Sequence, residues 1–200
     1  IANRENGDLI ISDAEKLRGD ILDKLVLNAA NNPSPEVKGL SRYVLKSAAL
    51  ELGIVPSSIQ GLYEARGRGE IKGFTVPALN IRGLPYELCR AIFRTALKTE
   101  AGAFIFELAK SEMGYTFQTP QELSSVILGA AIKEGYKGPV FIQGDHFQVN
   151  AKNYTKDKDK EIAGLKKLIE NGIAGAFYNI DIDTSTLVDL SHATVVEQQR

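Results

Sequence analysis

The sequence has very little cysteine, no excess of charge of one sign and no long apolar run. Its single cysteine, Cys89, cannot form an internal disulfide, and it falls in a predicted amphipathic helix where a buried thiol behaves as a small apolar side chain. The 24 basic and 25 acidic side chains leave a net charge of −1, so no overall field holds a polyanion or an anionic membrane. These absences argue against a disulfide-stabilised secreted domain, a nucleic-acid binding protein and a membrane-surface protein.

The apolar runs are all shorter than the roughly 20 residues that cross a bilayer, and no basic stretch followed by an apolar stretch opens the chain. We therefore expect a cytoplasmic protein in a reducing compartment. Because the chain opens on Ile1 and stops at Arg200 inside what resembles the start of a helix, we also expect sequence to be missing at both ends. With 200 residues and 44% hydrophobic content, the chain can bury a real core in one or at most two domains.

The first third of the sequence is typical of helices. Ser12 and Glu15 have the spacing of a capping box, which predicts a helix over about 13–29. Ser34 and Pro35 form a cap and first-turn pair for a second helix that ends at Gly53. A third, shorter helix is expected over about 56–65.

Short apolar segments alternate with amphipathic helices from residue 74 onward. The segments are apolar on both alternating faces, as strands covered on both sides must be, so they predict parallel strands. The expected strands are 74–81, 103–108, 140–143 and 175–182, with helical patterns around 88–95, 123–131 and 162–169 and a further helix beginning near Val195. The order is βαβαβαβ, with strands recurring at the spacing of a strand-loop-helix unit.

Two α/β architectures agree with this order, an open doubly wound sheet and an eight-strand barrel. A nucleotide-binding open sheet has a glycine-rich turn directly after its first strand, whereas the segment 81–85 here reads Ile-Arg-Gly-Leu-Pro. The barrel is therefore favoured. Residues 69–200 would hold about the first four β/α units of a (β/α)8 TIM barrel, preceded by an α-helical N-terminal extension over 1–68. Four strands leave the sheet edges unpaired, so we expect the rest of the chain or another polypeptide to complete the barrel.

Reactive side chains gather at the carboxyl ends of the strands in both architectures. Acidic and imidazole groups that converge on one edge can hold a metal and move a proton. The residues at the predicted strand ends are Asn80, Glu107, Asp145 with His146, and Asp181 with Asp183.

The segment from Gly144 to His146 is the most informative of these. A neutral imidazole can bind a metal, and the carboxylate beside it can accept or donate a proton. The structural alternative is that Asp145 and His146 only cap a loop. Asp181 and Asp183 share a strand face and repel each other unless a cation or proton lies between them, but one of them could instead cap the helix that follows.

Other polar segments have simpler interpretations. Glu107 could reach Lys110, which is itself more typical of a surface lysine than of a Schiff-base lysine. His192 has no partner at metal-ligand spacing. The glycine-rich stretch 66–73 precedes a strand and predicts a solvated turn, and the alternating charges of 152–160 predict an exposed loop.

Three short motifs resemble the class II, metal-dependent ketose-bisphosphate aldolases. Residues 63–81 are similar to that family's opening, a helix that ends in a glycine-rich turn and is followed by a V-P-A-F-N type strand. The pair Asp145-His146 is similar to its D-H motif, and the segment 180–185 to its I-D-x-S element. The first sixty residues resemble no family.

The resemblance implies a (β/α)8 barrel that cleaves or forms a ketose bisphosphate such as fructose 1,6-bisphosphate, giving dihydroxyacetone phosphate and an aldehyde. In that case His146 is one of three ligands to Zn²⁺ or another divalent metal, Asp181 supports the metal site and Asp145 exchanges a proton with the substrate. Asn80 and Glu107 would contact the sugar phosphate, and the protein would form a homo-oligomer. The remaining metal ligands and the base would belong to later strands, so the chain alone is expected to be inactive.

Two departures from the family favour other functions. Ala109 stands where many of these aldolases place a phosphate-binding serine. The segments around Asp145 and after Glu107 look closer to the non-catalytic subunit of tagatose-bisphosphate aldolase, which supports a catalytic aldolase partner. A sugar-phosphate binding barrel without activity is the third alternative.

Overall fold

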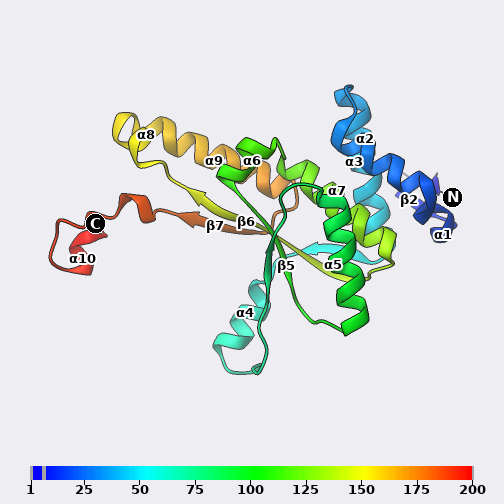
Figure 1. Ribbon diagram of the computed structural model, residues 1–200, viewed down its shortest axis with the longest axis horizontal. Helices are drawn as coiled ribbons and strands as arrows, with labels where there is room; N and C mark the ends of the chain where they lie inside the picture. Colours follow the sequence, from blue (N-terminus) through cyan, green and yellow to red (C-terminus); the bar gives the residue numbers. More distant parts are fainter. Residues whose placement is uncertain (1, 6–7, 200) are drawn as a thin grey trace.

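The computed structural model describes residues 2–5 and 8–199, and its centre is a parallel sheet of five strands (Figure 1). The strands are β3 (Ile54–Ser57), β4 (Ala78–Asn80), β5 (Ile105–Ala109), β6 (Gly138–Gln148) and β7 (Asn179–Asp183). The sheet order is β3-β6-β5-β4, and β7 also pairs with β6. In this α/β fold the four strands expected from the sequence, β4 to β7, are all present and parallel.

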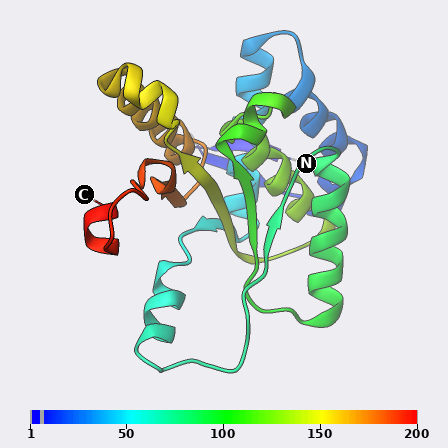
Figure 2. The ribbon, with the colours of Figure 1, turned by 60° about the vertical axis from the view of Figure 1, so that its left-hand side comes forward.

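Strands β4, β5, β6 and β7 are neighbours in the order in which they follow one another along the chain. The helices α5 (Pro85–Thr99), α7 (Pro120–Glu134) and α9 (Lys158–Ala174) connect them, as the helical periodicities predict. Because right-handed crossovers that always step in the same direction place their helices on one face, these three helices cover one side of the sheet (Figure 2). The other face is left to polar side chains of the strands.

The hydrophobic core lies between the sheet and these helices. Phe93 of α5 packs against Phe106 of β5 and against Tyr136, with ring centroids 5.1 and 4.8 Å apart. Leu108 and Ile142 on the same side of the sheet are fully buried. Aromatic pairs at such distances add about 0.5–1.5 kcal/mol beyond the area that they bury.

The N-terminal helices pack on α7 and share this core. They are α1 (Ala14–Lys16), a π-helical segment η1 (Leu17–Ile21), α2 (Leu22–Asn31) and α3 (Pro35–Glu51). The two long helices predicted here are confirmed. Ser34 caps α3 by accepting from the Val37 amide at 3.3 Å, as predicted, but α1 is capped by Asp13 and not by Ser12, and Glu15 pairs with Arg18.

The segment 1–68, predicted as an α-helical extension, also contains three strands among its described residues. The chain opens with an antiparallel pair, β1 (Ala2–Glu5) and β2 (Asp8–Ile11). The helix predicted from about residue 56 begins only at Gln60, as α4 (Gln60–Gly67), because residues 54–57 form β3 and pair with β6. The β-branched residues Ile54 and Val55 favour a strand, and Pro56 is tolerated there since β3 lies at an edge.

Short helices complete the chain: α6 (Lys110–Thr116), α8 (Ala151–Lys156), η2 (Ser185–Leu187) and α10 (Val195–Gln198). Residues 152–160 are mostly exposed, as predicted, but they are helical and not a loop. Asn150 and Asp157 each cap a helix there by accepting from an amide three residues on. The helix predicted near Val195 is present. Over residues 2–5 and 8–199, none of the helices combines the length and the apolar character that a membrane crossing requires.

Candidate metal centre

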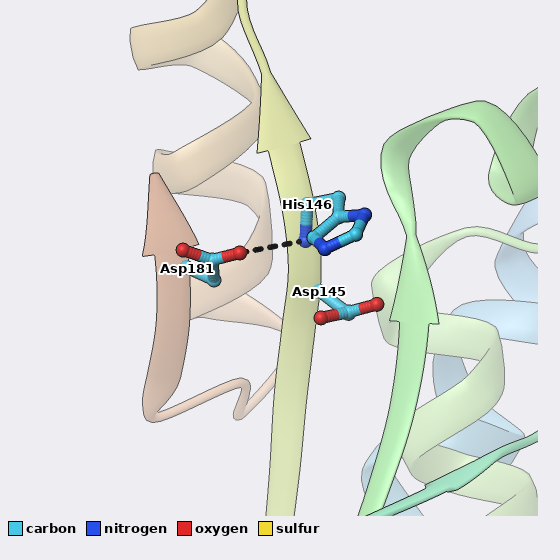
Figure 3. Close-up of side chains that lie close together, drawn as sticks. All are labelled: Asp145, His146 and Asp181. Carbon is cyan, nitrogen blue, oxygen red and sulfur yellow. Dashed lines mark hydrogen bonds between the residues drawn. The ribbon is translucent and has the colours of Figure 1, made fainter. Parts of the chain in front are cut away.

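Three side chains from two neighbouring strands meet at the carboxyl edge of the sheet (Figure 3). Asp145 and His146 come from β6 and Asp181 from β7, and one potential ligand atom of each lies within 4.8 Å of the others. Asp145 is half-buried, whereas His146 and Asp181 are exposed. The sequence placed all three at strand ends, and the structure brings them together.

A bulge in β6 creates this arrangement. Between Gly144 and Phe147 the strand has one residue more than the facing stretch of β7, where Ile180 and Ile182 are the partners. His146 takes up the extra length with a positive φ of 43°. Bulges of this kind re-aim side chains, here so that the consecutive residues Asp145 and His146 both reach the same cluster.

Glycine at position 144 is required by the packing beneath the bulge. A Cβ on Gly144 would lie 2.5 Å from the ring of Phe147, which is fully buried. The ring fills the space under the strand on the helix side of the sheet, where it also lies near Gly172 of α9. The small residue and the buried ring together hold the backbone that presents Asp145 and His146.

The donor set fits a divalent cation with open coordination positions. Oδ2 of Asp181 accepts from the backbone amide of His146 at 3.3 Å, which fixes this carboxylate and leaves its second oxygen available (Figure 3). Asp145 leans from β6 toward β5. An imidazole nitrogen and carboxylate oxygens are ligands of catalytic zinc, which normally takes three protein ligands and keeps a position for water or substrate.

A row of polar side chains crosses the sheet below this cluster. Asn80 pairs in register with Glu107, Glu107 with Gln143, and Gln143 with Asn179. Residues in register on parallel strands point to the same face, so the row lies on the face that the helices do not cover. Nε2 of Gln143 lies 3.4 Å from Oε2 of Glu107, and the carboxylate of Glu107 does not contact Lys110, because the Lys110 ammonium binds the Gln148 carbonyl and Glu161.

The Glu107 carboxyl is half-buried in the middle of its strand. Burial raises the pKa of Glu107 above its ordinary value of 4.5, and the nearby carboxylates of Asp145 and Glu112 raise it further, while His146 lowers it. The side chain therefore holds a proton more tightly than an exposed glutamate does.

Glu112 is a site residue that the sequence analysis missed. It is buried at the first turn of α6, and its Oε2 accepts from Asn80 Nδ2 at 2.7 Å and from the Ala109 amide at 2.9 Å. Its Oε1 pairs with Arg82 at 3.1 Å. Asn80 is thus held by Glu112, and its Oδ1 is buried with no partner among the described residues. The only sequence signal for Glu112 was its position three residues after Ala109, the N-cap of α6, from which its side chain can reach back to the N-cap amide.

Asp183 and His192 lie outside the cluster. Asp183 accepts from the backbone amide of Ser185 at 2.8 Å and from Gln148 Nε2 at 2.6 Å. Hydrogen bonds from Ser185 and Gln148 lower the pKa of Asp183. Asp183 therefore engages the amide at the start of η2, as one of the two predicted alternatives proposed, although the N-cap residue itself is Thr184. His192 lies 3.5 Å from Asp189 in the exposed segment near the end of the chain.

At this edge of the sheet one imidazole and two carboxylates lie close enough to share a cation, and a row of amides and a carboxyl lies beneath them. No protein-family model matches the chain, and no curated protein and no solved structure matches it either.

Proposed function

We propose that this chain is part of a divalent metal-dependent aldolase that cleaves or forms the carbon-carbon bond of a ketose bisphosphate. The observation that carries the proposal is the meeting of Asp145, His146 and Asp181 at the carboxyl edge of the parallel sheet. This is the edge at which α/β enzymes place their catalytic groups. Zn²⁺ is the cation that we expect, with another divalent metal as the alternative.

The proposed architecture is half of a (β/α)8 barrel. Three features support it: the consecutive order of β4 to β7, the helices on one face only and the polar row on the opposite face. A doubly wound sheet would carry helices on both faces. In a barrel the polar row faces the interior below the catalytic end.

In this proposal His146 and Asp181 hold the cation. A bound divalent cation polarises a ketone carbonyl and stabilises the negative charge that develops next to it, so no lysine imine is required. The amide of His146 binds Oδ2 of Asp181, and this contact fixes the carboxylate beside the imidazole.

Asp145 moves the proton. It leans away from Asp181 toward β5 (Figure 3), and the paired residues Glu107 of β5 and Gln143 of β6 lie two residues before the level of Asp145. A carboxylate that stays off the cation keeps the proton affinity needed to exchange a proton with a substrate hydroxyl. Asn80 and Glu107 are proposed to contact the sugar, and a homo-oligomer is the proposed assembly.

Metal content and aldol cleavage, measured on the same variants made in the complete barrel with its later strands, test this division of roles. We expect His146→Ala to lower both bound zinc and the cleavage of fructose or tagatose bisphosphate. Asp145→Asn should keep the metal and reduce turnover by about two to four orders of magnitude, the usual effect of losing a positioned acid or base. His192→Ala, which removes the histidine outside the cluster, should change neither quantity.

Equal metal loss in the Asp145 and His146 variants would contradict the roles. Zinc binding with no cleavage of either bisphosphate by the complete barrel, alone or with a partner subunit added, would contradict the aldolase itself.

A non-catalytic supporting subunit is the second candidate. The observation that favours it is Ala109, which lies in register with Asp145 and offers no hydrogen-bonding side chain where a phosphate-binding serine is expected. Turnover by the full-length polypeptide that appears only when a second aldolase subunit is added would support this function, whereas its chelator-sensitive turnover without a partner would exclude it.

A further inference from the structure

Arg82 is an exposed arginine that a buried carboxylate holds at the same edge of the sheet. It follows β4, and its side chain is 53% exposed while that of Glu112 is 11% exposed. Nη1 of Arg82 lies 3.1 Å from Glu112 Oε1 and 3.3 Å from the hydroxyl of Tyr115. The other oxygen of Glu112 is fixed by Asn80 and by the Ala109 amide, so the carboxylate is a rigid anchor.

The Arg82 guanidinium has hydrogen-bond donors that its protein contacts do not use. Both of its contacts use Nη1, and in the described part of the chain no protein group accepts from Nε or Nη2. These two nitrogens carry the parallel N–H groups with which arginine binds a phosphate through two hydrogen bonds at once. Because the side chain is exposed at this position, a ligand can reach them.

The register places Arg82 level with the metal cluster. Asn80, the last residue of β4, pairs with Glu107, and extending this register by two residues brings Arg82 to the height of Ala109, which pairs with Asp145. Neighbouring strands are about 4.8 Å apart, which puts Arg82 about 10 Å from Asp145 along the edge. A phosphorylated sugar can span such a separation with its reacting carbon at the cluster and its phosphate at the guanidinium.

The other groups at this edge cannot take that phosphate. Lys110 is occupied by the Gln148 carbonyl at 2.8 Å and by Glu161 at 3.2 Å. The backbone amide of Ala109 is already bonded to Glu112, and the alanine side chain offers nothing. Asp145 and Asp181 of the cluster are carboxylates, which repel an anion, and His146 is the proposed ligand of the cation.

We propose that Arg82, positioned by Glu112, binds the phosphate group of the substrate and so selects phosphorylated sugars for the Asp145 and His146 site. The inference rests on the proposed function for the reaction itself, but the binding of a phosphate monoester by Arg82 can be measured independently of that reaction.

Calorimetric titration of the full chain with inorganic phosphate, glycerol 3-phosphate and glycerol tests the proposal in the absence of metal. We expect both phosphates to bind and glycerol not to. Arg82→Gln should weaken phosphate binding at least about tenfold, because it removes charge-assisted hydrogen bonds. Arg82→Lys keeps the charge and loses the planar pair of donors, so its phosphate affinity should lie between those of the unaltered chain and of Arg82→Gln.

Arg68→Gln is the matched control. Arg68 is also an exposed arginine paired with glutamates, with its Nε 2.6 Å from Glu70 Oε1. It follows α4, whose Leu62 lines a cavity of about 220 Å³ together with Phe104 and Pro139 at the amino ends of β5 and β6, so it lies away from the carboxyl edge. We expect Arg68→Gln to bind both phosphates as the unaltered chain does.

No phosphate binding by the unaltered chain, full binding by Arg82→Gln, or equal loss in Arg82→Gln and Arg68→Gln would each overturn the proposal. The test is independent of the aldolase function: Arg82-dependent phosphate binding in a chain whose His146 holds no metal would leave the phosphate site standing while the proposed reaction fails.

Discussion

Glu107 is a carboxyl in the middle of a strand, on the face that the helices leave uncovered. Its pKa is raised by burial and then by Asp145 and Glu112, so the folded chain keeps this proton to a higher pH than the unfolded chain does. As the pH rises through 4.5, the unfolded chain loses the proton first, and the free energy of unfolding falls until the folded chain is also deprotonated.

Glu107→Gln removes this titration, so the variant should be the more stable form at neutral pH and should lose its advantage in acid. We expect a rise in Tm of about one or two degrees at neutral pH. Thermal unfolding between about pH 4 and about pH 8 measures the effect. Glu51→Gln, at an exposed position at the end of α3, is the control. If the Tm difference between Glu107→Gln and the unaltered chain stays constant with pH or is inverted, the folded state does not hold the Glu107 proton.

The sequence predicted some site residues and not others for a physical reason. Asp145, His146 and Asp181 follow apolar strands, and because the carboxyl ends of parallel strands share one edge, their proximity could be expected. Glu112 and Arg82 belong to a helix turn and a loop, where sequence spacing does not fix the direction of a side chain. The bulge at His146 was also not predictable, since the insertion of one residue depends on the pairing of β6 with β7.

The same contrast holds for helices and strands. The long helices were predicted because their caps and periodicity are local properties of the chain. β3 was missed because Pro56 resembles the start of a helix, and only the pairing of residues 54–57 with β6 makes this segment a strand.

The cap of α3 is a direct test of one such local signal. Ser34→Ala removes the side-chain acceptor of the Val37 amide, which should cost about 1 kcal/mol of unfolding free energy. Urea unfolding followed by circular dichroism measures the change. Ser47→Ala, in the middle of the same helix, should be neutral or slightly stabilising because alanine has the higher helix propensity; equal losses in both variants would mean that the cap contributes nothing.

The sequence predicted strands β4 to β7 of the sheet but not β3 at its edge. β3 and β7 lie one after the other along the same side of β6, pairing with its first four and its last six residues. The parallel sheet with alternating helices follows from the apolar periodicity of 74–182, whereas the closure of a barrel depends on pairing with strands beyond β4 and β7 and stays a prediction. The shared core of the N-terminal helices and α7 likewise depends on long-range contacts.

The stability of the molecule as a whole should depend most on the aromatic core around Phe93. This side chain is fully buried between Phe104, Phe106 and Tyr136, so Phe93→Ala should cost roughly 3–5 kcal/mol through lost burial and the cavity that remains. Phe117→Ala is the control, because the Phe117 ring is 85% exposed and its removal should change the free energy of unfolding by less than about 0.5 kcal/mol.

Cys89 provides the readout for this last prediction. Its thiol is fully buried one helical turn from Phe93 in α5, and burial raises its pKa, so a thiol reagent should modify it only after the core opens. We expect the labelling rate to increase by at least about a hundredfold in Phe93→Ala, since each 1.4 kcal/mol changes the open population tenfold, and to be unchanged in Phe117→Ala. Rapid labelling of the unaltered chain, or equal rates in the two variants, would show that α5 opens without disrupting the core and that Phe93 is not what holds it in place.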